Sequence, residues 1–166
     1  MINRCLLAVI LLLTSCASSQ DVIYPVSNDP SIIKIKEFYT GYGKVFKSES
    51  EANRDVFGNK YPGNILNNFK EDLELTDDLI LKAERLLIDK LKNNNLKHHY
   101  RQYLGFVNDE GDKIVLINLL NFKDKNKGKK YFKNWQNSLL IGHGKYYEKN
   151  QNGYLINITK ERIKRF

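Results

Sequence analysis

The chain has 166 residues and a formal net charge of +8, with 21 lysines, 6 arginines and 19 asparagines. This length suits a single domain with a sizeable core. Because proteins that read nucleic acids favour the bidentate fork of arginine, the excess of lysine over arginine argues against a nucleic-acid partner.

The first 15 residues have the three parts of a secretory signal peptide. One positive charge at Arg4 precedes an unbroken apolar run over residues 5–13, and the small polar residues Thr14 and Ser15 follow it. A helix that crosses a bilayer needs about 20 apolar residues, and this run has nine. Residues 1–15 are therefore predicted to direct export and to be removed.

Residues Leu13, Thr14, Ser15 and Cys16 resemble the lipobox of bacterial lipoproteins, in which an aliphatic residue and two small residues precede an obligatory cysteine. In that family the cysteine sulfur carries a diacylglycerol, the chain is cut just before the cysteine, and the new amine is acylated. The resemblance implies a membrane anchor on Cys16 and a place in the bacterial cell envelope. Ala17, in place of aspartate, resembles lipoproteins that are sent to the outer membrane.

The second cysteine of the chain, Cys5, leaves with the predicted signal peptide. Because Cys16 is expected to carry lipid, the mature protein would have no free thiol. A disulfide, a cysteine nucleophile and a cysteine metal site are therefore not expected. The sequence nominates no cofactor and no metal site.

Residues 16–30 are small and polar and contain two prolines, which predicts a lipidated tether. A single α+β domain is expected over residues 31–166, with Asp29 and Pro30 as a helix start. Apolar side chains then recur at helical spacing and predict a helix from about residue 31 to 40 that continues imperfectly to 47. They are Ile32, Ile35, Tyr39, Tyr42 and Phe46.

Within this segment, Phe38, Tyr39 and Tyr42 resemble the opening helix of the NTF2-like superfamily, where such residues pack under a curved sheet. The resemblance implies a cone-shaped α+β fold. Residues 48–75 are polar and predict loop, with a short helix in 65–73. Thr76 then caps the clearest helix of the chain, which has an apolar stripe as far as Leu91 and ends at the asparagines 93–95.

The remainder of the sequence predicts two consecutive β-hairpins. Strands at 99–107 and 113–122 flank a turn in which Gly111 supplies the left-handed residue. The second of these strands is apolar at nearly every position, so we expect it to be buried on both faces. Strands at 139–147 and 153–163 flank a turn at Asn152-Gly153. The expected fold is α+β, with N-terminal helices packed on one face of a four-stranded antiparallel meander.

His143 lies between two glycines and is the best catalytic candidate, as a general acid or base. The alternative is an ordinary bulged strand, because no spacing in the sequence nominates a partner for this histidine. His98 and His99 are adjacent, so on a strand they point to opposite faces and do not share a metal.

Six lysines lie between residues 123 and 133, interleaved with aromatic residues. From this segment, Lys129, Lys130 and Trp135 are candidates for binding an anionic envelope glycolipid or polysaccharide. The alternative is a solvated loop whose aromatic residues turn back into the core. Arg101 and Tyr103 are further binding candidates, because with Gln102 and Asn118 they would line a concave face of the sheet. The alternative for them is ordinary strand packing.

Three functions follow from these patterns. The favoured one is a lipid-anchored envelope protein whose domain is a non-catalytic binding or accessory module, with an envelope component or a protein as its partner. The second is a small envelope hydrolase that uses His143 as its acid or base. The third is an inhibitor or immunity-type lipoprotein that blocks a toxin or a cell-wall hydrolase.

Overall fold

The computed structural model describes residues 23–25, 28–35, 38, 41–52, 66, 68–92 and 96–166. The predicted signal peptide, the lipobox with Cys16, and the asparagines at 93–95 lie outside the described residues. Among the helices that are described, none combines the length and the apolar character needed to cross a bilayer.

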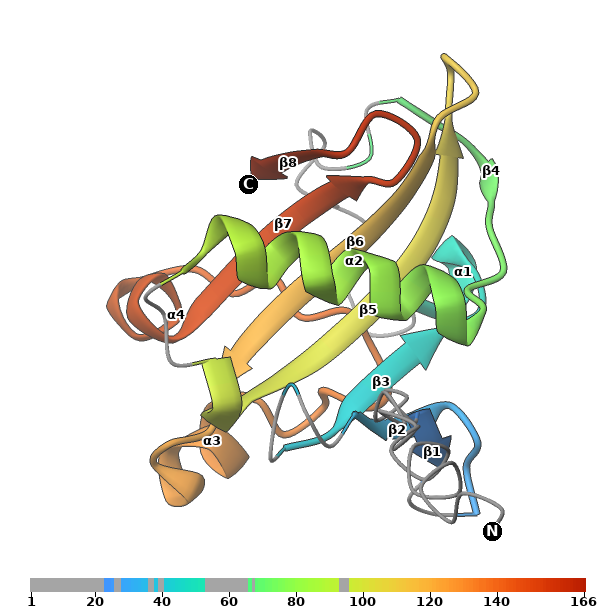
Figure 1. Ribbon diagram of the computed structural model, residues 1–166. Helices are drawn as coiled ribbons and strands as arrows, with labels where there is room; N and C mark the ends of the chain where they lie inside the picture. Colours follow the sequence, from blue (N-terminus) through green and yellow to red (C-terminus); the bar gives the residue numbers. More distant parts are fainter. Residues whose placement is uncertain are drawn as a thin grey trace, which may run out of the picture.

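The described chain is an α+β fold built on one mixed sheet (Figure 1). Its strands are β1 (Ile23–Pro25), β2 (Ile32–Ile35), β3 (Gly43–Phe46), β4 (Phe69–Asp72), β5 (His99–Asn108), β6 (Lys113–Asn121), β7 (Gln151–Asn157) and β8 (Arg162–Arg165). Its helices are α1 (Glu49–Ala52), α2 (Asp77–Lys90), α3 (Lys125–Tyr131) and α4 (Lys145–Asn150), with a 3-10 turn at Leu96–His98.

Seven of the strands follow each other across the sheet in the order β1-β2-β3-β5-β6-β7-β8, and β4 pairs with the far end of β5. The pair β3 and β5 is parallel, and the other pairs of described strands are antiparallel. The sheet therefore starts at β1, ahead of the domain start that we predicted near Ser31.

The structure confirms the first predicted hairpin. Strands β5 and β6 pair antiparallel over their length, and Gly111 in the turn has a φ of 80°. Residues 114–120 of β6 are all buried, as the continuous apolar run predicted. This hairpin forms the centre of the sheet, with β3 and β4 on one side and β7 on the other.

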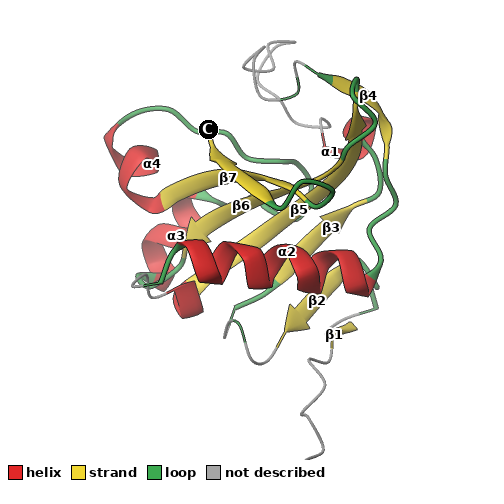
Figure 2. Cartoon of the chain, turned by 45° about the horizontal axis from the view of Figure 1, so that its top comes forward, coloured by secondary structure: helices red, strands yellow, loops and turns green. Residues whose placement is uncertain are grey.

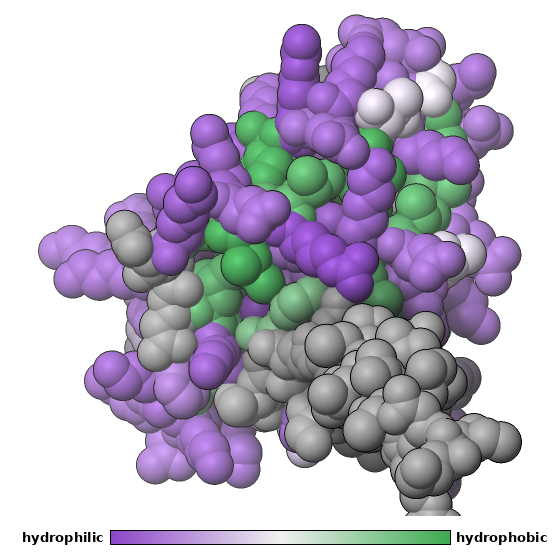
Figure 3. Space-filling view, in the orientation of Figure 1, coloured by the Kyte–Doolittle hydropathy of each residue, from purple (hydrophilic) through white to green (hydrophobic). Residues whose placement is uncertain are grey.

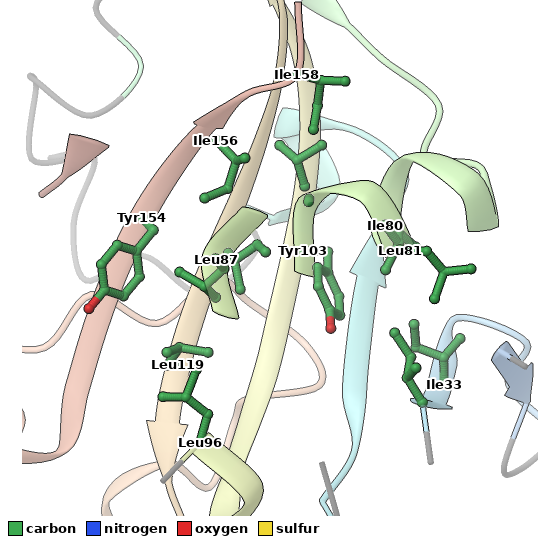
Figure 4. Packing of buried hydrophobic residues seen from close by; sticks show 14 residues of the cluster. Ile33, Ile80, Leu81, Leu87, Leu96, Tyr103, Leu119, Tyr154, Ile156 and Ile158 are labelled. Carbon is green, nitrogen blue, oxygen red and sulfur yellow. The ribbon is translucent and has the colours of Figure 1, made fainter. Parts of the chain in front are cut away.

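The predicted helix at Thr76 is also confirmed. The Thr76 hydroxyl accepts a hydrogen bond from the backbone N–H of Leu79 at 3.4 Å, and α2 runs to Lys90. Figures 1 and 2 show α2 lying across one face of the sheet. Its apolar stripe points at the strands, so that Leu87 lies close to side chains such as Ile156 in the core (Figure 4).

The prediction of an N-terminal helix is wrong, because residues 32–35 and 43–46 are the strands β2 and β3. The helical spacing was misleading, since Ile33 and Ile35 face the α2 side of the sheet whereas Ile32 belongs to a cluster on the other side. These β-branched residues suit a strand buried on both faces. Of the residues that carry the NTF2-like resemblance, Phe38 and Tyr42 are not in a helix, and Tyr39 lies outside the described residues.

The second predicted hairpin is also wrong. Residues 139–143 have no regular structure and α4 follows them, while Asn152-Gly153 lies inside β7. Gly153 is explained by close packing, because a Cβ atom there would lie 2.2 Å from the ring of Phe166. Similarly, the short helix predicted in 65–73 is not found, and β4 occupies residues 69–72.

The second face of the sheet is covered by the segment that follows β6. Phe132, Trp135 and Leu139 from this segment pack in two clusters with strand residues such as Leu116 and Leu120. The helices and loops therefore cover both faces of the sheet, and not one face as predicted. The four-stranded meander is replaced by a larger mixed sheet between two layers.

Candidate functional site

The structure places Arg101 and Tyr103 in the core beneath α2. Both side chains are fully buried, and they meet Glu84 of α2. The Arg101 Nε atom donates to Glu84 Oε1 at 3.3 Å, and the Tyr103 hydroxyl donates to the same oxygen at 2.8 Å. Arg101 also donates to the carbonyl of Leu96 at 2.8 Å. These two binding candidates therefore join α2 to the sheet, and they do not line a concave surface.

Trp135 is also part of the core. Its side chain is 8 % exposed and meets the ring of Tyr100 edge-on, with 5.0 Å between the ring centroids. The neighbouring Phe132 is fully buried in the same cluster. The aromatic residues of this segment thus turn inward, while the lysines remain at the surface.

An amide network that the sequence analysis missed holds this segment against the sheet. Gln102 on β5 donates from Nε2 to the carbonyls of Trp135 and Ser138 at 2.6 and 2.7 Å. Its Oε1 atom accepts from Asn118 Nδ2 at 2.8 Å and from the backbone N–H of Leu140 at 2.9 Å. One buried glutamine therefore fixes four groups, three of them in the chain after α3.

The network continues to β7. Gln151 donates from Nε2 to Asn118 Oδ1 at 3.1 Å and to the carbonyl of Leu140, and its Oε1 accepts from the Gly142 N–H at 3.0 Å. The sequence contained one signal of this network, which is the polar residue Asn118 in the apolar strand β6. A buried amide needs several hydrogen-bond partners, so a network around it could have been expected. The partners themselves lie up to 38 residues away from Gln102.

His143 lies in the loop that enters α4. The residue is exposed. Within the described part of the chain, its side chain forms no hydrogen bond or ion pair with a carboxylate or a nucleophile. The described residues also bring together no group of three or more histidine, cysteine, aspartate or glutamate side chains that could hold a metal.

The clearest feature for binding is a basic cavity of about 690 Å³ between α3 and α4, which we call the α3–α4 cavity. Four lysines line it: Lys123, Lys127, Lys145 and Lys149. Its other lining residues are Asn121, Asp124, Tyr131, Tyr146 and Asn150. Figure 3 shows a hydrophilic surface at the lower left, where Figure 1 places α3.

The two helices are joined by tyrosines. The rings of Tyr131 and Tyr146 stack with 3.8 Å between their centroids and 18° between their planes. In addition, the Tyr147 hydroxyl donates to the carbonyl of Tyr131 at 3.2 Å. Stacked rings of this kind are rigid and amphipathic, so they hold the lysines of two separate segments around one space.

Asp124 sets the start of α3 and supplies the one negative charge of the α3–α4 cavity lining. Its side chain accepts from the backbone N–H of Lys127 at 3.1 Å, and this bond lowers the pKa of the Asp124 carboxyl from its ordinary value. Burial, together with the nearby Asp124 charge, raises the pKa of Tyr146. The lining therefore combines four lysines with one aspartate and two tyrosines.

Of the predicted binding lysines, Lys129 and Lys130 lie exposed on α3 beside this cavity. The Nζ atom of Lys130 is 5.4 Å from the centroid of the Tyr131 ring. The sequence indicated the lysines before Tyr131. Lys145 and Lys149 come from α4, where we had predicted the end of a strand and the turn after it.

No protein family, curated protein or solved structure matches the chain. An excess of positive charge in a cavity with phenol and amide groups is suited to binding an anion that also carries hydroxyl groups.

Proposed function

We propose that this protein is a lipid-anchored component of the bacterial cell envelope, held by Cys16, and that its folded domain is a non-catalytic binding module. Its ligand is an anionic envelope glycolipid or polysaccharide. The observation that carries this proposal is the α3–α4 cavity, with four lysines around a pair of stacked tyrosines.

The charge of the cavity supports an anionic ligand. Four lysines and one aspartate leave an excess of three positive charges along its lining. Each lysine ammonium has three donors on a flexible stem, which suits phosphate and carboxylate groups at variable positions. Phenol and amide groups between the lysines pair with sugar hydroxyls. Binding of this kind requires no nucleophile and no general acid.

The place of the cavity in the fold also supports an envelope ligand. In Figure 1, α3 and the first described strand, β1, both lie in the lower part of the molecule. The proposed anchor precedes β1 in the chain. A basic surface at this end adds electrostatic attraction to the hydrophobic attachment of the lipid.

Replacing Cys16 with alanine is expected to abolish lipid attachment. Cells that express the variant would incorporate no labelled fatty acid into the protein, and the protein would leave the membrane fraction. The matched control is Cys5→Ala, which changes the other cysteine of the chain and keeps both the label and the membrane location. Label retained by Cys16→Ala would contradict the proposed anchor.

The double variant Lys145→Ala/Lys149→Ala is expected to weaken binding to immobilised lipopolysaccharide about tenfold, because two ion pairs of up to about 1 kcal/mol each are lost. Biolayer interferometry with the purified protein measures this affinity. The remaining binding should weaken further as salt is added, since salt screens exposed charges.

The control for this measurement is Lys90→Ala/Lys164→Ala, which removes the same charge from exposed positions on α2 and β8. We expect it to reduce affinity less than twofold, because neither lysine lines the cavity. Equal losses in the two double variants would mean that net charge, and not the α3–α4 cavity, binds the polysaccharide.

A further inference from the structure

A second cavity, of about 1050 Å³, lies apart from the α3–α4 cavity and shares no lining residue with it. Its walls come from three segments, residues 29–31, 44–51 and 136–137. Apart from Pro30, the lining residues are serine, lysine, aspartate, glutamate, glutamine and asparagine. We call it the Lys44 cavity.

Lys44 is the buried centre of this cavity. Its side chain is 6 % exposed, and its Nζ atom lies 3.5 Å from Asp29 Oδ2 and 3.3 Å from Glu51 Oε1. The same atom donates to the Ser31 hydroxyl at 2.5 Å. A lysine removed from water needs such partners, because desolvation disfavours its charge. Lys44 therefore holds two carboxylates in fixed positions.

Asp29 also faces outward, whereas the side chain of Glu51 is only 21 % exposed. The side chain of Asp29 is 51 % exposed, although it accepts hydrogen bonds from the N–H and the hydroxyl of Ser31 at 2.9 and 2.5 Å. Glu51 is held by the backbone N–H of Lys47 at 2.7 Å. An ionised carboxylate has about four acceptor positions. A carboxylate that Lys44 holds in place can therefore also accept a hydrogen bond from a ligand in the cavity.

The opposite wall is fixed by the amide network. Gln136 and Asn137 lie between Trp135 and Ser138, whose carbonyls both accept from Gln102 Nε2. The next residue is tied to α1, because the Leu139 N–H donates to the carbonyl of Ala52 at 2.7 Å. The two exposed amides are thus presented by a clamped loop, which lowers the entropy cost of binding.

Charge distinguishes this cavity from the α3–α4 cavity. Two carboxylates, Asp29 and Glu51, are balanced by two ammonium groups, Lys44 and Lys47. A neutral ligand with many hydroxyl groups fits this balance, because its hydroxyls donate to carboxylates and accept from lysine and amide N–H groups.

The arrangement favours binding over glycoside hydrolysis. Two carboxylates near one sugar are typical of glycosidases, but one of the pair must be protonated to act as the acid. The Ser31 hydroxyl, and then the Lys44 charge, lower the pKa of the Asp29 carboxyl. Asp29 is therefore ionised at neutral pH, and Lys44 occupies the position between the two carboxylates.

We propose that the Lys44 cavity is a binding site for a neutral saccharide, separate from the anionic ligand of the α3–α4 cavity. Exposed carboxylate, hydroxyl and amide groups supply its hydrogen bonds. This site does not depend on the proposed function, because the two cavities have different lining residues and require ligands of different charge.

The experiment is a titration of the purified full chain with three neutral disaccharides, N,N′-diacetylchitobiose, maltose and cellobiose. Trp135 is the single tryptophan of the chain and adjoins Gln136 in the cavity wall, so its fluorescence reports binding. We expect the fluorescence to change and then saturate with at least one of the sugars. The dissociation constant should be about 1 mM, so the titration extends to about 10 mM sugar. No saturable change with any of the three would overturn the proposal.

Two variants test the assignment to this cavity. Asp29→Asn and Asn137→Ala should each weaken binding about tenfold, the loss of one strong hydrogen bond. Asn137→Ala keeps the Lys44 ion pairs and serves if Asp29→Asn does not fold, as judged by far-ultraviolet circular dichroism. Asp89→Asn, at an exposed position on α2, is the matched control and should bind normally.

The α3–α4 double variant Lys145→Ala/Lys149→Ala should bind the sugar normally. The proposal would be overturned if Asp29→Asn and Asn137→Ala both bound the sugar with unchanged affinity. It would also be overturned if Lys145→Ala/Lys149→Ala lost as much affinity for the sugar as these two variants. A failure of lipopolysaccharide binding, by contrast, would count against the proposed function alone.

Discussion

Arg101→Ala is expected to destabilise the fold by about 3–5 kcal/mol, because it leaves the carboxylate of Glu84 buried without its positive partner. Arg101 and Glu84 are both fully buried, and 3.3 Å separates Arg101 Nε from Glu84 Oε1. The Tyr103 hydroxyl, which donates to the same oxygen, does not compensate for the charge. Urea unfolding, analysed as a two-state transition, measures the loss of unfolding free energy.

Two comparisons show whether the ion pair is the cause. The double variant Glu84→Leu/Arg101→Met removes both charges and fills the space with apolar groups, so it should be more stable than Arg101→Ala. Arg85→Ala changes an exposed arginine on the same helix as Glu84 and should cost less than about 0.5 kcal/mol. A double variant no more stable than Arg101→Ala would show that packing, and not charge, explains the loss.

This buried pair also illustrates what the sequence did not reveal. Arg101 was a binding candidate because it would line a concave face of the sheet with Tyr103 and Asn118, and strand packing was the alternative. Its partner is 17 residues away on α2. The helix itself was predicted correctly, since its cap and apolar stripe are local signals. Contacts between a helix and a sheet depend on how the two elements pack, which periodicity does not define.

The same distinction explains the errors at the N-terminus. Ile32, Ile35 and Phe46 have helical spacing, but pairing with neighbouring strands determines their structure. Strand β3 pairs parallel with β5, more than 50 residues later in the chain. The β5–β6 hairpin was predictable because its partners are adjacent and its turn contains Gly111. Pairing between distant segments leaves no such local pattern.

For the α3–α4 cavity, the sequence indicated one of its two sides. The lysine run after residue 122 pointed to a basic surface, and the structure places Lys123 and Lys127 in the cavity lining. Lys145 and Lys149 are four residues apart, which puts them on one face of a helix. Residues 139–147 had been predicted as a strand and residues 148–153 as the turn after it, so Lys145 and Lys149 were not expected on one element and the second side was missed.

The two cavities share a dependence on the segment between β6 and β7. This segment supplies α3, α4 and the loop residues Gln136 and Asn137. The amide groups of Gln102, Asn118 and Gln151 hold it against the sheet. Amide side chains on three neighbouring strands thus attach the covering segment to this face of the sheet, whereas the apolar stripe of α2 attaches the helix to the other face.

Gln102→Leu is expected to destabilise the fold by about 3 kcal/mol, because it leaves buried partners without hydrogen bonds while it preserves most of the side-chain volume. The carbonyls of Trp135 and Ser138 lose their donor, and the Leu140 N–H loses its acceptor. The free energy of opening, measured by hydrogen exchange at the Leu140 amide, should fall at least as much as the free energy of unfolding, since the loop is released locally. Urea unfolding and exchange measured by NMR test both effects.

The matched control is Gln136→Ala, which changes an exposed glutamine in the same loop and should cost less than about 0.5 kcal/mol. Gln102→Leu should also weaken saccharide binding at the Lys44 cavity, because Gln136 and Asn137 lose the clamp that presents them. Normal stability and normal Leu140 exchange in Gln102→Leu would show that the loop is held by its aromatic contacts alone. Since neither substitution changes Phe132 or Trp135, the difference between the two variants isolates the contribution of the amide network.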